Sequence, residues 1–292
     1  MTFTVKTLSM VGAGSVIVLT ISILSATIGP IGSAQAQNVL IINGASGTSE
    51  PATTGDITTN LNILLQDANF TTTISDGVPI NLTGFNQIWD IRFSNNLAIT
   101  STEETQYLGF LQGGGGMFVM GENSSFPTRN NSVLSLIQAA GGGSLNFTTP
   151  LSTQGVLSPF DMPNTIPSGN VTYAFPGGVT SFGTGQFITV DSNGDGTGVA
   201  FAKGTLGNAP NGVLTTIFDV NFMEASFNQP NSQNLLKNLI GFIDEETNGV
   251  QTVPEPTSTL SLLALGTLGA VSTLKRKLKP SQSTEKETIK VG

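Results

Sequence analysis

The chain has 292 residues, and its 19 acidic side chains against 11 basic ones give a formal net charge of −8. It contains neither cysteine nor histidine, which excludes disulfide bonds, cysteine nucleophiles, histidine bases and ordinary zinc or haem sites. From Gln37 to Val253 four basic residues stand against 16 acidic ones, so we expect no nucleic-acid partner and repulsion from anionic membrane surfaces.

The first 36 residues have the three parts of a secretory signal. Lys6 is the only charge before an apolar stretch at 11–28, and small residues follow at Ala34 and Ala36. Signal peptidase accepts only small side chains at its cleavage site. We therefore expect cleavage after Ala36 by signal peptidase, with a retained membrane anchor as the alternative.

The next region alternates between strand and helix patterns. A continuous apolar run at 38–42 is typical of a strand buried on both faces, and the apolar residues at 57–68 recur at helical spacing. Further strands are predicted at 88–91, 117–120 and 213–218, and further helices at 100–111, 133–140 and 235–243. Strands that alternate with helices imply right-handed crossovers and a parallel sheet covered on both faces. We predict an α/β fold with an open, mostly parallel, three-layer sheet.

Two local signals refine this prediction. Thr100 and Ser101, with Glu103 and Glu104, form overlapping capping boxes at the start of one helix. Between about 144 and 212 the helical periodicity disappears, and short Thr, Val and Phe runs are separated by Pro and Gly. This segment predicts a β-rich insertion that packs on or extends one edge of the sheet.

Two apolar strands carry a resemblance to a known family. The run from Val39 to Gly44 and the run from Gly115 to Asn123 resemble the first strand and the nucleophile turn of class I glutamine amidotransferase-like, flavodoxin-like proteins. The resemblance covers about Asn38 to Asp244 and implies a flavodoxin-like sheet. Where such an enzyme has its nucleophilic cysteine, this chain has Gly121-Glu122-Asn123, and its histidine partner cannot exist. Glutaminase chemistry is therefore excluded.

In an open α/β sheet, ligands bind beyond the carboxyl ends of the strands. The candidate crevice residues at these ends are Asn43 to Ser46, Asp90, Arg92, Glu122, Asn123, Arg129 and Asp219. The two arginines could pair with Glu122, bind an anionic group or form a buried structural ion pair.

A second candidate site begins at Asp191. Asp191, Asn193 and Asp195 present oxygen ligands at alternating positions, and Gly196 occupies the sixth position, as at the start of a calcium loop. Position twelve is Ala202 where a bidentate glutamate is usual. A plain Asx-Gly turn between two strands is the preferred interpretation, and calcium binding the alternative.

The C-terminal region has a Pro-Glu-Pro motif, an apolar span and a basic cluster. The motif Val253-Pro254-Glu255-Pro256 precedes 18 uncharged residues, Thr257–Leu274, which span about 27 Å as a helix. The basic cluster Lys275-Arg276-Lys277 follows and should stay on the cytoplasmic side. Together these parts resemble the PEP-CTERM sorting signal of exported bacterial proteins. The resemblance implies cleavage by an exosortase and a final place at the cell surface or in the extracellular polysaccharide matrix, with an ordinary membrane anchor as the alternative.

The predicted organisation follows from these signals. We expect a signal peptide at 1–36, an α/β domain at 37–246, a linker with the Pro-Glu-Pro motif at 247–256, a membrane segment with the basic cluster at 257–279 and a tail at 280–292. The protein is then a single-pass membrane intermediate before it reaches the surface or matrix.

The leading functional prediction is a non-enzymatic surface protein that binds a carbohydrate or matrix component in the crevice. Such binding requires exposed aromatic rings, for which Trp89, Tyr107, Tyr173 and phenylalanines are available. One alternative is a hydrolase of surface polysaccharide, with Glu122 and either Asp90 or Asp219 as acid and base. Another is a calcium-binding structural matrix protein. No cofactor is expected apart from calcium in that last case.

Overall fold

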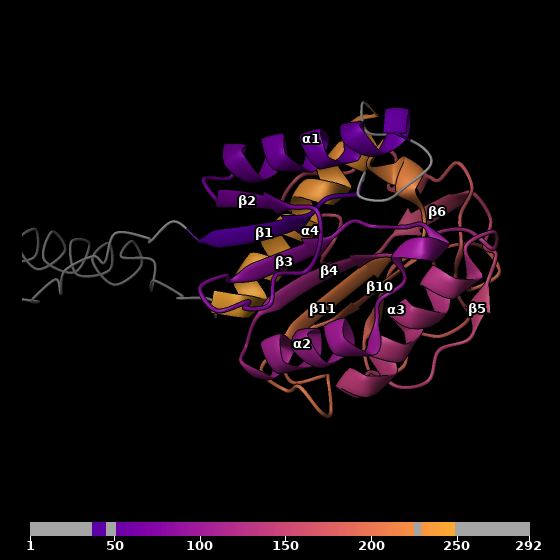
Figure 1. The fold of residues 1–292 in the computed structure, drawn as a ribbon. Helices are drawn as coiled ribbons and strands as arrows, with labels where there is room; N and C mark the ends of the chain where they lie inside the picture. The colour runs from indigo at the N-terminus through magenta and orange to yellow at the C-terminus, as the bar shows by residue number, and fades with distance from the viewer. Residues whose placement is uncertain (1–36, 45–50, 225–228, 249–292) are drawn as a thin grey trace, which may run out of the picture. The chain divides into compact units, whose positions relative to one another are not determined.

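The computed structural model describes residues 37–44, 51–224 and 229–248 (Figure 1). The predicted signal peptide, Ser46 of the candidate crevice and the whole C-terminal sorting signal lie outside these residues. In the part that is described, no helix is both long and apolar enough to cross a membrane. Export, sorting and membrane insertion therefore stay predictions.

Strands and helices alternate in the first half of the domain, and short strands dominate its second half. The strands are β1 (Asn38–Ile42), β2 (Thr71–Ser75), β3 (Gln87–Asp90), β4 (Gly116–Met120), β5 (Phe147–Thr148), β6 (Thr153–Val156), β7 (Asn170–Thr172), β8 (Gly178–Val179), β9 (Gln186–Val190), β10 (Gly198–Phe201) and β11 (Val213–Ile217). The helices are α1 (Pro51–Asp67), α2 (Ser101–Gln112), α3 (Pro127–Ala140) and α4 (Pro230–Asn248), with short 3-10 helices η1 (Asn95–Leu97) and η2 (Val220–Phe222).

Nine of these strands form one sheet in the order β2-β1-β3-β4-β11-β10-β9-β6-β7, and β5 pairs with β8. The first five strands in this order, β2, β1, β3, β4 and β11, are parallel. They follow the 2-1-3-4-5 order of a flavodoxin-like sheet, with β11 as the fifth strand. The strands β10, β9, β6 and β7 continue the sheet in antiparallel pairs. The predicted α/β class with a parallel central sheet is therefore confirmed, and strands from the predicted β-rich segment extend one edge.

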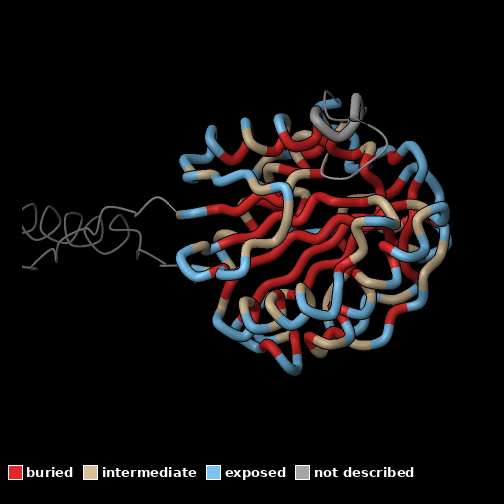
Figure 2. The backbone as a smooth tube through the Cα atoms, in the orientation of Figure 1, coloured by how far each residue is buried: buried red, intermediate tan, exposed pale blue. Residues whose placement is uncertain are grey.

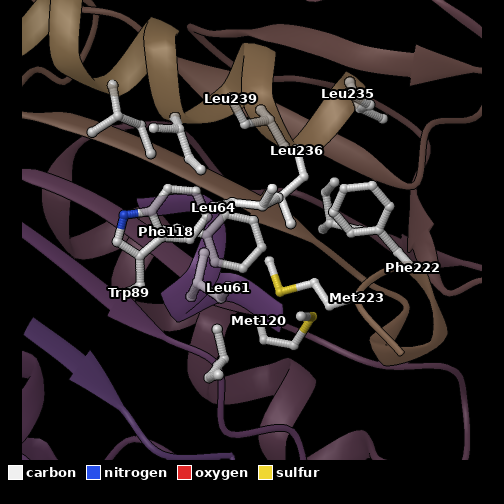
Figure 3. Close-up of a cluster of buried hydrophobic side chains, with 14 of the residues drawn as sticks. Leu61, Leu64, Trp89, Phe118, Met120, Phe222, Met223, Leu235, Leu236 and Leu239 are labelled. Atoms are coloured by element: carbon white, nitrogen blue, oxygen red, sulfur yellow. The ribbon is translucent and has the colours of Figure 1, made fainter. Parts of the chain in front are cut away.

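The central strands are buried on both faces, which explains their continuous apolar sequences (Figure 2). On one face, Ile41, Trp89 and Phe118 belong to a cluster with residues of α1 and α4. Trp89 and Phe118 stack with ring centroids 4.8 Å apart in this cluster (Figure 3). On the other face, Leu40 and Met117 pack with residues of α2 and α3. Each fully buried large apolar side chain contributes about 1.5–3 kcal/mol, so these two layers hold the sheet in place.

Local signals fix the ends of the two helices on this second face. The hydroxyl of Thr100 accepts a hydrogen bond from the Glu103 N–H at 3.3 Å, and the Glu103 carboxylate accepts one from the Thr100 N–H at 2.8 Å. Of the two overlapping capping boxes in the sequence, the first one therefore starts α2. Helix α3 begins with Pro127 and ends at Ala140, and the next residue, Gly141, caps it with a φ of +89°, the left-handed conformation that glycine adopts freely.

Outside the predicted β-rich segment, the strand β2 was not predicted from the sequence. The edge strand β2 has the sequence Thr-Thr-Thr-Ile-Ser and is partly exposed along its length, so it lacks an apolar run. Within the described region it pairs with β1 alone. Its place is set by the parallel pairing with β1.

Candidate functional site

The carboxyl ends of the parallel strands bring the predicted crevice residues to one edge of the sheet. Asn43 follows β1, Asp90 ends β3, Glu122 follows β4 and Asp219 follows β11. The exposed fractions of the three carboxylate side chains are small, with Asp90 at 0%, Glu122 at 1% and Asp219 at 0%. Within the described region these carboxylates therefore lie beneath the surface of this edge.

Asp90 lies at the centre of a buried ion cluster. Arg92 donates from Nε to Oδ1 at 2.8 Å and from Nη2 to Oδ2 at 2.7 Å, and the Tyr107 hydroxyl donates to Oδ2 at 2.9 Å. Arg129 Nη2 lies 3.3 Å from Asp90 Oδ1, and Arg92 Nη1 lies 2.9 Å from Glu103 Oε1. Two carboxylates thus neutralise two guanidinium groups, and the cluster joins β3 to α2 and α3.

The cluster shows which residues Arg92 and Arg129 contact, which the sequence left open. Arg129 is fully buried, and its Nε and Nη1 donate to the carbonyl oxygens of Met120 and Leu97, each at 2.9 Å. Neither of the two arginines pairs with Glu122 among the ion pairs of the described residues, because both face Asp90. Both arginines therefore pair with Asp90, which supports the buried structural ion pair over a pair with Glu122.

The charges of the cluster determine which of its groups can exchange a proton. Burial alone would raise the pKa of Asp90, but Arg129 and Arg92, with hydrogen bonds from Arg92 and Tyr107, lower it to about 2. Burial and the charge of Asp90 raise the pKa of Tyr107, so its hydroxyl stays protonated and donates. Asp90 is therefore ionised at neutral pH and is unsuited to act as a general acid.

Glu122 lies directly after β4, where the sequence resemblance predicts a nucleophile turn. Its Oε1 accepts hydrogen bonds from the backbone N–H and the side-chain amide of Asn123, at 3.0 and 2.7 Å. Its Oε2 accepts one from the Val220 N–H at 2.5 Å. Asn130 of α3 accepts from the Glu122 N–H at 2.8 Å and donates to the Glu122 carbonyl at 2.7 Å. These bonds fasten the turn to η2 and α3.

Asp219 is a second buried carboxylate at this edge, and its charge acts on Glu122. Its Oδ1 accepts from the Asn221 N–H at 2.7 Å and caps η2, and its Oδ2 accepts from the Phe175 N–H at 3.4 Å. Burial raises the pKa of Asp219 to about 6. Burial, and to a smaller degree the charge of Asp219, raise the pKa of Glu122 to about 7, although hydrogen bonds from Asn123 and Val220 oppose the rise. Both oxygens of each carboxylate are thus acceptors in hydrogen bonds within the protein.

The segment from Tyr173 to Gly178 covers the Glu122 and Asp219 pair. The Gly177 N–H donates to the Phe218 carbonyl at 2.8 Å, and a Cβ atom on Gly177 would lie only 2.4 Å from the Glu122 carbonyl oxygen. Glycine is therefore required for this close approach. The ring of Phe175, two residues earlier, is 68% exposed. A large apolar ring thus faces solvent at the edge where the strands end.

The aromatic residues differ from the sequence-based prediction. Trp89, Tyr107 and Tyr173, which we considered for ligand stacking, are all buried in the two apolar clusters. Phe175 was not singled out from the sequence. Its position directly before Pro176 and Gly177, outside any strand or helix pattern, was the signal that it lies in a loop.

The candidate calcium loop forms the turn between β9 and β10. Asp191 Oδ1 accepts from the N–H groups of Asn193 and Asp195 at 2.7 and 3.0 Å, and its Oδ2 accepts from the Leu151 N–H at 2.7 Å. These backbone bonds lower the pKa of Asp191 against the effect of burial. No group of three or more carboxylates that could hold a metal ion occurs among the described residues. This geometry supports the plain turn, and calcium binding stays an untested prediction.

Comparisons with known proteins address only the fold. No family model and no curated protein matches the chain. The chain is similar to the mmIFT52 N-terminal domain, with a TM-score of 0.51 and 10% identity over 71% of this chain and 97% of that one.

Two further solved structures have lower TM-scores. A ThuA-like protein from Bacteroides uniformis ATCC 8492 has a TM-score of 0.48 and 15% identity, over 74% of this chain and 95% of that one. The exo-beta-1,4-mannosidase Op5Man5 from Opitutaceae bacterium strain TAV5 has a TM-score of 0.46 and 12% identity, over 72% of this chain and 36% of that one. Since identity is this low in every case, the likeness to the mmIFT52 domain shows a shared α/β fold and nothing about activity.

Proposed function

We propose that the chain is an exported, non-catalytic binding protein, which its C-terminal PEP-CTERM signal delivers to the cell surface or extracellular matrix. The observation that supports binding best is the exposed ring of Phe175 at the carboxyl edge of the sheet. Ligands of open α/β sheets bind at this edge. The flat apolar face of a sugar ring stacks on an aromatic ring, so a carbohydrate of the matrix is the proposed ligand.

A glycan array with the Gln37–Val253 domain tests the binding proposal. Phe175→Ala should lower the signal of any bound glycan, since it removes the exposed ring. Phe182→Ala is the matched control, because Phe182 is also exposed, at 44%, but packs near the opposite end of α3 against Phe187. A glycan that binds equally well to Phe175→Ala, or an array with no bound glycan, would contradict the proposal.

The sorting proposal has a separate test in cells. Replacing Pro254-Glu255-Pro256 with three alanines should leave the unprocessed protein in the cytoplasmic membrane and reduce the surface fraction. A C-terminal anchor that needs no processing enzyme predicts an unchanged surface fraction. The intact Met1 at the N-terminus of mature protein, seen by mass spectrometry, would contradict export through the signal peptide.

A carboxylate-dependent hydrolase is the second candidate function. The raised pKa of Glu122, to about 7, favours it, because a general acid must be protonated near neutral pH. The burial of Glu122 and Asp219, and the hydrogen bonds that their oxygens accept, favour a structural role. Release of reducing ends from matrix polysaccharide that disappears in Glu122→Gln would support the hydrolase over the binding protein.

We also propose that the domain has an amidotransferase-like architecture without the corresponding chemistry. Acyl transfer at neutral pH needs a thiolate or a base-activated hydroxyl, and the chain has neither cysteine nor histidine. The purified domain should therefore lack glutaminase activity. Activity that persists in Glu122→Gln would overturn this proposal.

A further inference from the structure

A groove of about 610 Å³ lies between the end of α1, the segment 159–164 and the second half of α4. Its apolar lining includes Leu64, Phe70, Met162, Ile240 and Phe242. Met162 is 56% exposed, so the groove is open to solvent. It lies beside α1 and α4, away from the carboxylates of the candidate site.

The wall formed by 159–164 is fixed to α4 by one buried amide. The Asn238 Nδ2 donates to the carbonyl oxygens of Phe160 and Asn164, at 2.8 and 2.9 Å. The Asn238 Oδ1 accepts from the N–H and the side-chain amide of Asn164, both at 2.9 Å. Because all these polar groups are satisfied, the groove is pre-formed and loses little entropy when it is filled.

The α4 side of the groove has a basic end and an acidic end. Lys237, Gly241 and Glu245 are four residues apart and so lie along one face of the helix, with Asp244 beside Glu245. Lys237 makes no ion pair with any described residue, and its Nζ lies 3.5 Å from the Gln233 amide oxygen. Gly241 leaves open space where a Cβ would stand. The lining therefore combines apolar side chains with one cation, Lys237, at one end of its α4 side and three carboxylates, Asp67, Asp244 and Glu245, elsewhere.

We propose that this groove binds the chain's own segment Val250–Pro256, which holds the Pro-Glu-Pro motif against the domain before processing. The segment combines apolar Val250, Val253 and two prolines with a single charge, Glu255. Docking places Glu255 at Lys237 and Val253 and Pro254 along the channel. The biological role of this docking rests on the proposed sorting function, but the contact itself does not.

The length of chain after α4 fits this path. From Asn248 back to Lys237 is 11 residues of helix, or about 16 Å. If two residues reverse the direction of the chain after Asn248, the five residues that end at Glu255 span about 16 Å when extended. The carboxylate of Glu255 therefore reaches Lys237 without strain in α4.

Zero-length cross-linking of the full chain in detergent micelles tests the proposal. A carbodiimide joins an amine to a carboxylate that touches it, so we expect an amide between Lys237 and Glu255 in the peptide map. Gly241→Gln should lower its yield about tenfold, because the new side chain fills the channel, and a tenfold loss corresponds to roughly 1.4 kcal/mol. This variant should fold well, since glutamine favours helix over glycine.

Gly109→Gln is the matched control. Gly109 lies in α2, also with open space at its Cβ position, and is remote from the groove. Its cross-link yield should equal that of the unmodified chain. An equal mixture of ¹⁴N and ¹⁵N protein should give no mixed-isotope cross-link, because the segment and the groove belong to one molecule.

Three results would overturn the proposal. They are coupling of Lys237 only to Asp67 or Glu245, an unchanged yield in Gly241→Gln, and mixed-isotope cross-links, which would place the segment on a second copy. The sorting proposal can fail separately from the docking proposal. That is the case if the unmodified chain gives the Lys237–Glu255 cross-link but the variant with three alanines at 254–256 keeps its surface fraction.

Discussion

Replacing Asp90 with asparagine should destabilise the domain strongly. Asp90 is the only carboxylate that faces Arg129 among the ion pairs of the described residues, at 3.3 Å, and Arg129 is fully buried. At an effective dielectric constant of 20, a pair of unit charges at this distance interacts by roughly 5 kcal/mol. Arg92 keeps Glu103 as a partner at 2.9 Å, so its loss is smaller. We expect the free energy of unfolding to fall by about 3–5 kcal/mol, as for other buried ion pairs that lose one partner.

Urea unfolding of the Gln37–Val253 domain measures this loss, and a double variant tests its cause. Asp90→Asn with Arg129→Met restores the neutrality of the buried cluster, so the double variant should be more stable than the sum of the two single losses predicts. We expect a coupling free energy of about 1–3 kcal/mol. A loss below about 1 kcal/mol in Asp90→Asn, or strictly additive losses in the double variant, would refute a structural role of the cluster charges.

Three further predictions concern how the stability of the domain depends on pH and on the turn at Asp191. Since the pKa of Asp90 is lowered to about 2, its stabilisation of about 2.5 kcal/mol should be present above pH 4 and be lost as the pH falls towards 2; unfolding curves of Asp90→Asn should lack this loss. Since the pKa of Glu122 is raised to about 7, its share of stability should fall by about 3 kcal/mol as the pH rises from 4.5 to 7, and Glu122→Gln should remove this share, while the fall that comes from Asp219, whose pKa is raised to about 6, remains; an unchanged total slope in the variant would assign all of it to other groups. Asp191→Ala removes the acceptor of three backbone N–H groups and should cost about 1–3 kcal/mol, while calcium should leave the unfolding midpoint unchanged; a midpoint that rises with calcium would instead support a metal site.

The fold could be predicted where burial leaves a strong pattern. The run at 38–42 and the run at 117–120 are apolar at every core position because parallel central strands are covered on both faces. The edge strand β2 has only one strand beside it, so its Thr-rich sequence carries no such pattern. The same reasoning explains why the short strands of the β-rich segment were recognised as a group but not individually.

The location of the candidate site could be predicted from the sequence, but the ion-pair partners of its residues could not. Asp90, Glu122 and Asp219 stand at strand ends, and parallel topology alone brings strand ends to one edge. The partners of Asp90 come from α2 and α3, and which side chains reach it depends on helix packing that no local pattern encodes. The covering segment with Phe175 was missed because it is an irregular loop whose path is set by contacts with Glu122 and Phe218.

The two ends of the described domain meet at one side of the sheet. Figure 1 shows the start of β1 and the end of α4 at the same side of the domain. The side chain of Gln37, directly before β1, donates to Asp244 in the last turns of α4. A domain whose ends are adjacent can be inserted into a loop of a host protein, or circularly permuted, without stretching either end. We therefore expect that joining Gln37 to Asn248 through a short linker, with new ends in the exposed Asn193–Gly194 turn, gives a domain that still folds. Such a permuted form would separate the α/β module from both of the proposed signals, so the module could be studied or inserted elsewhere on its own.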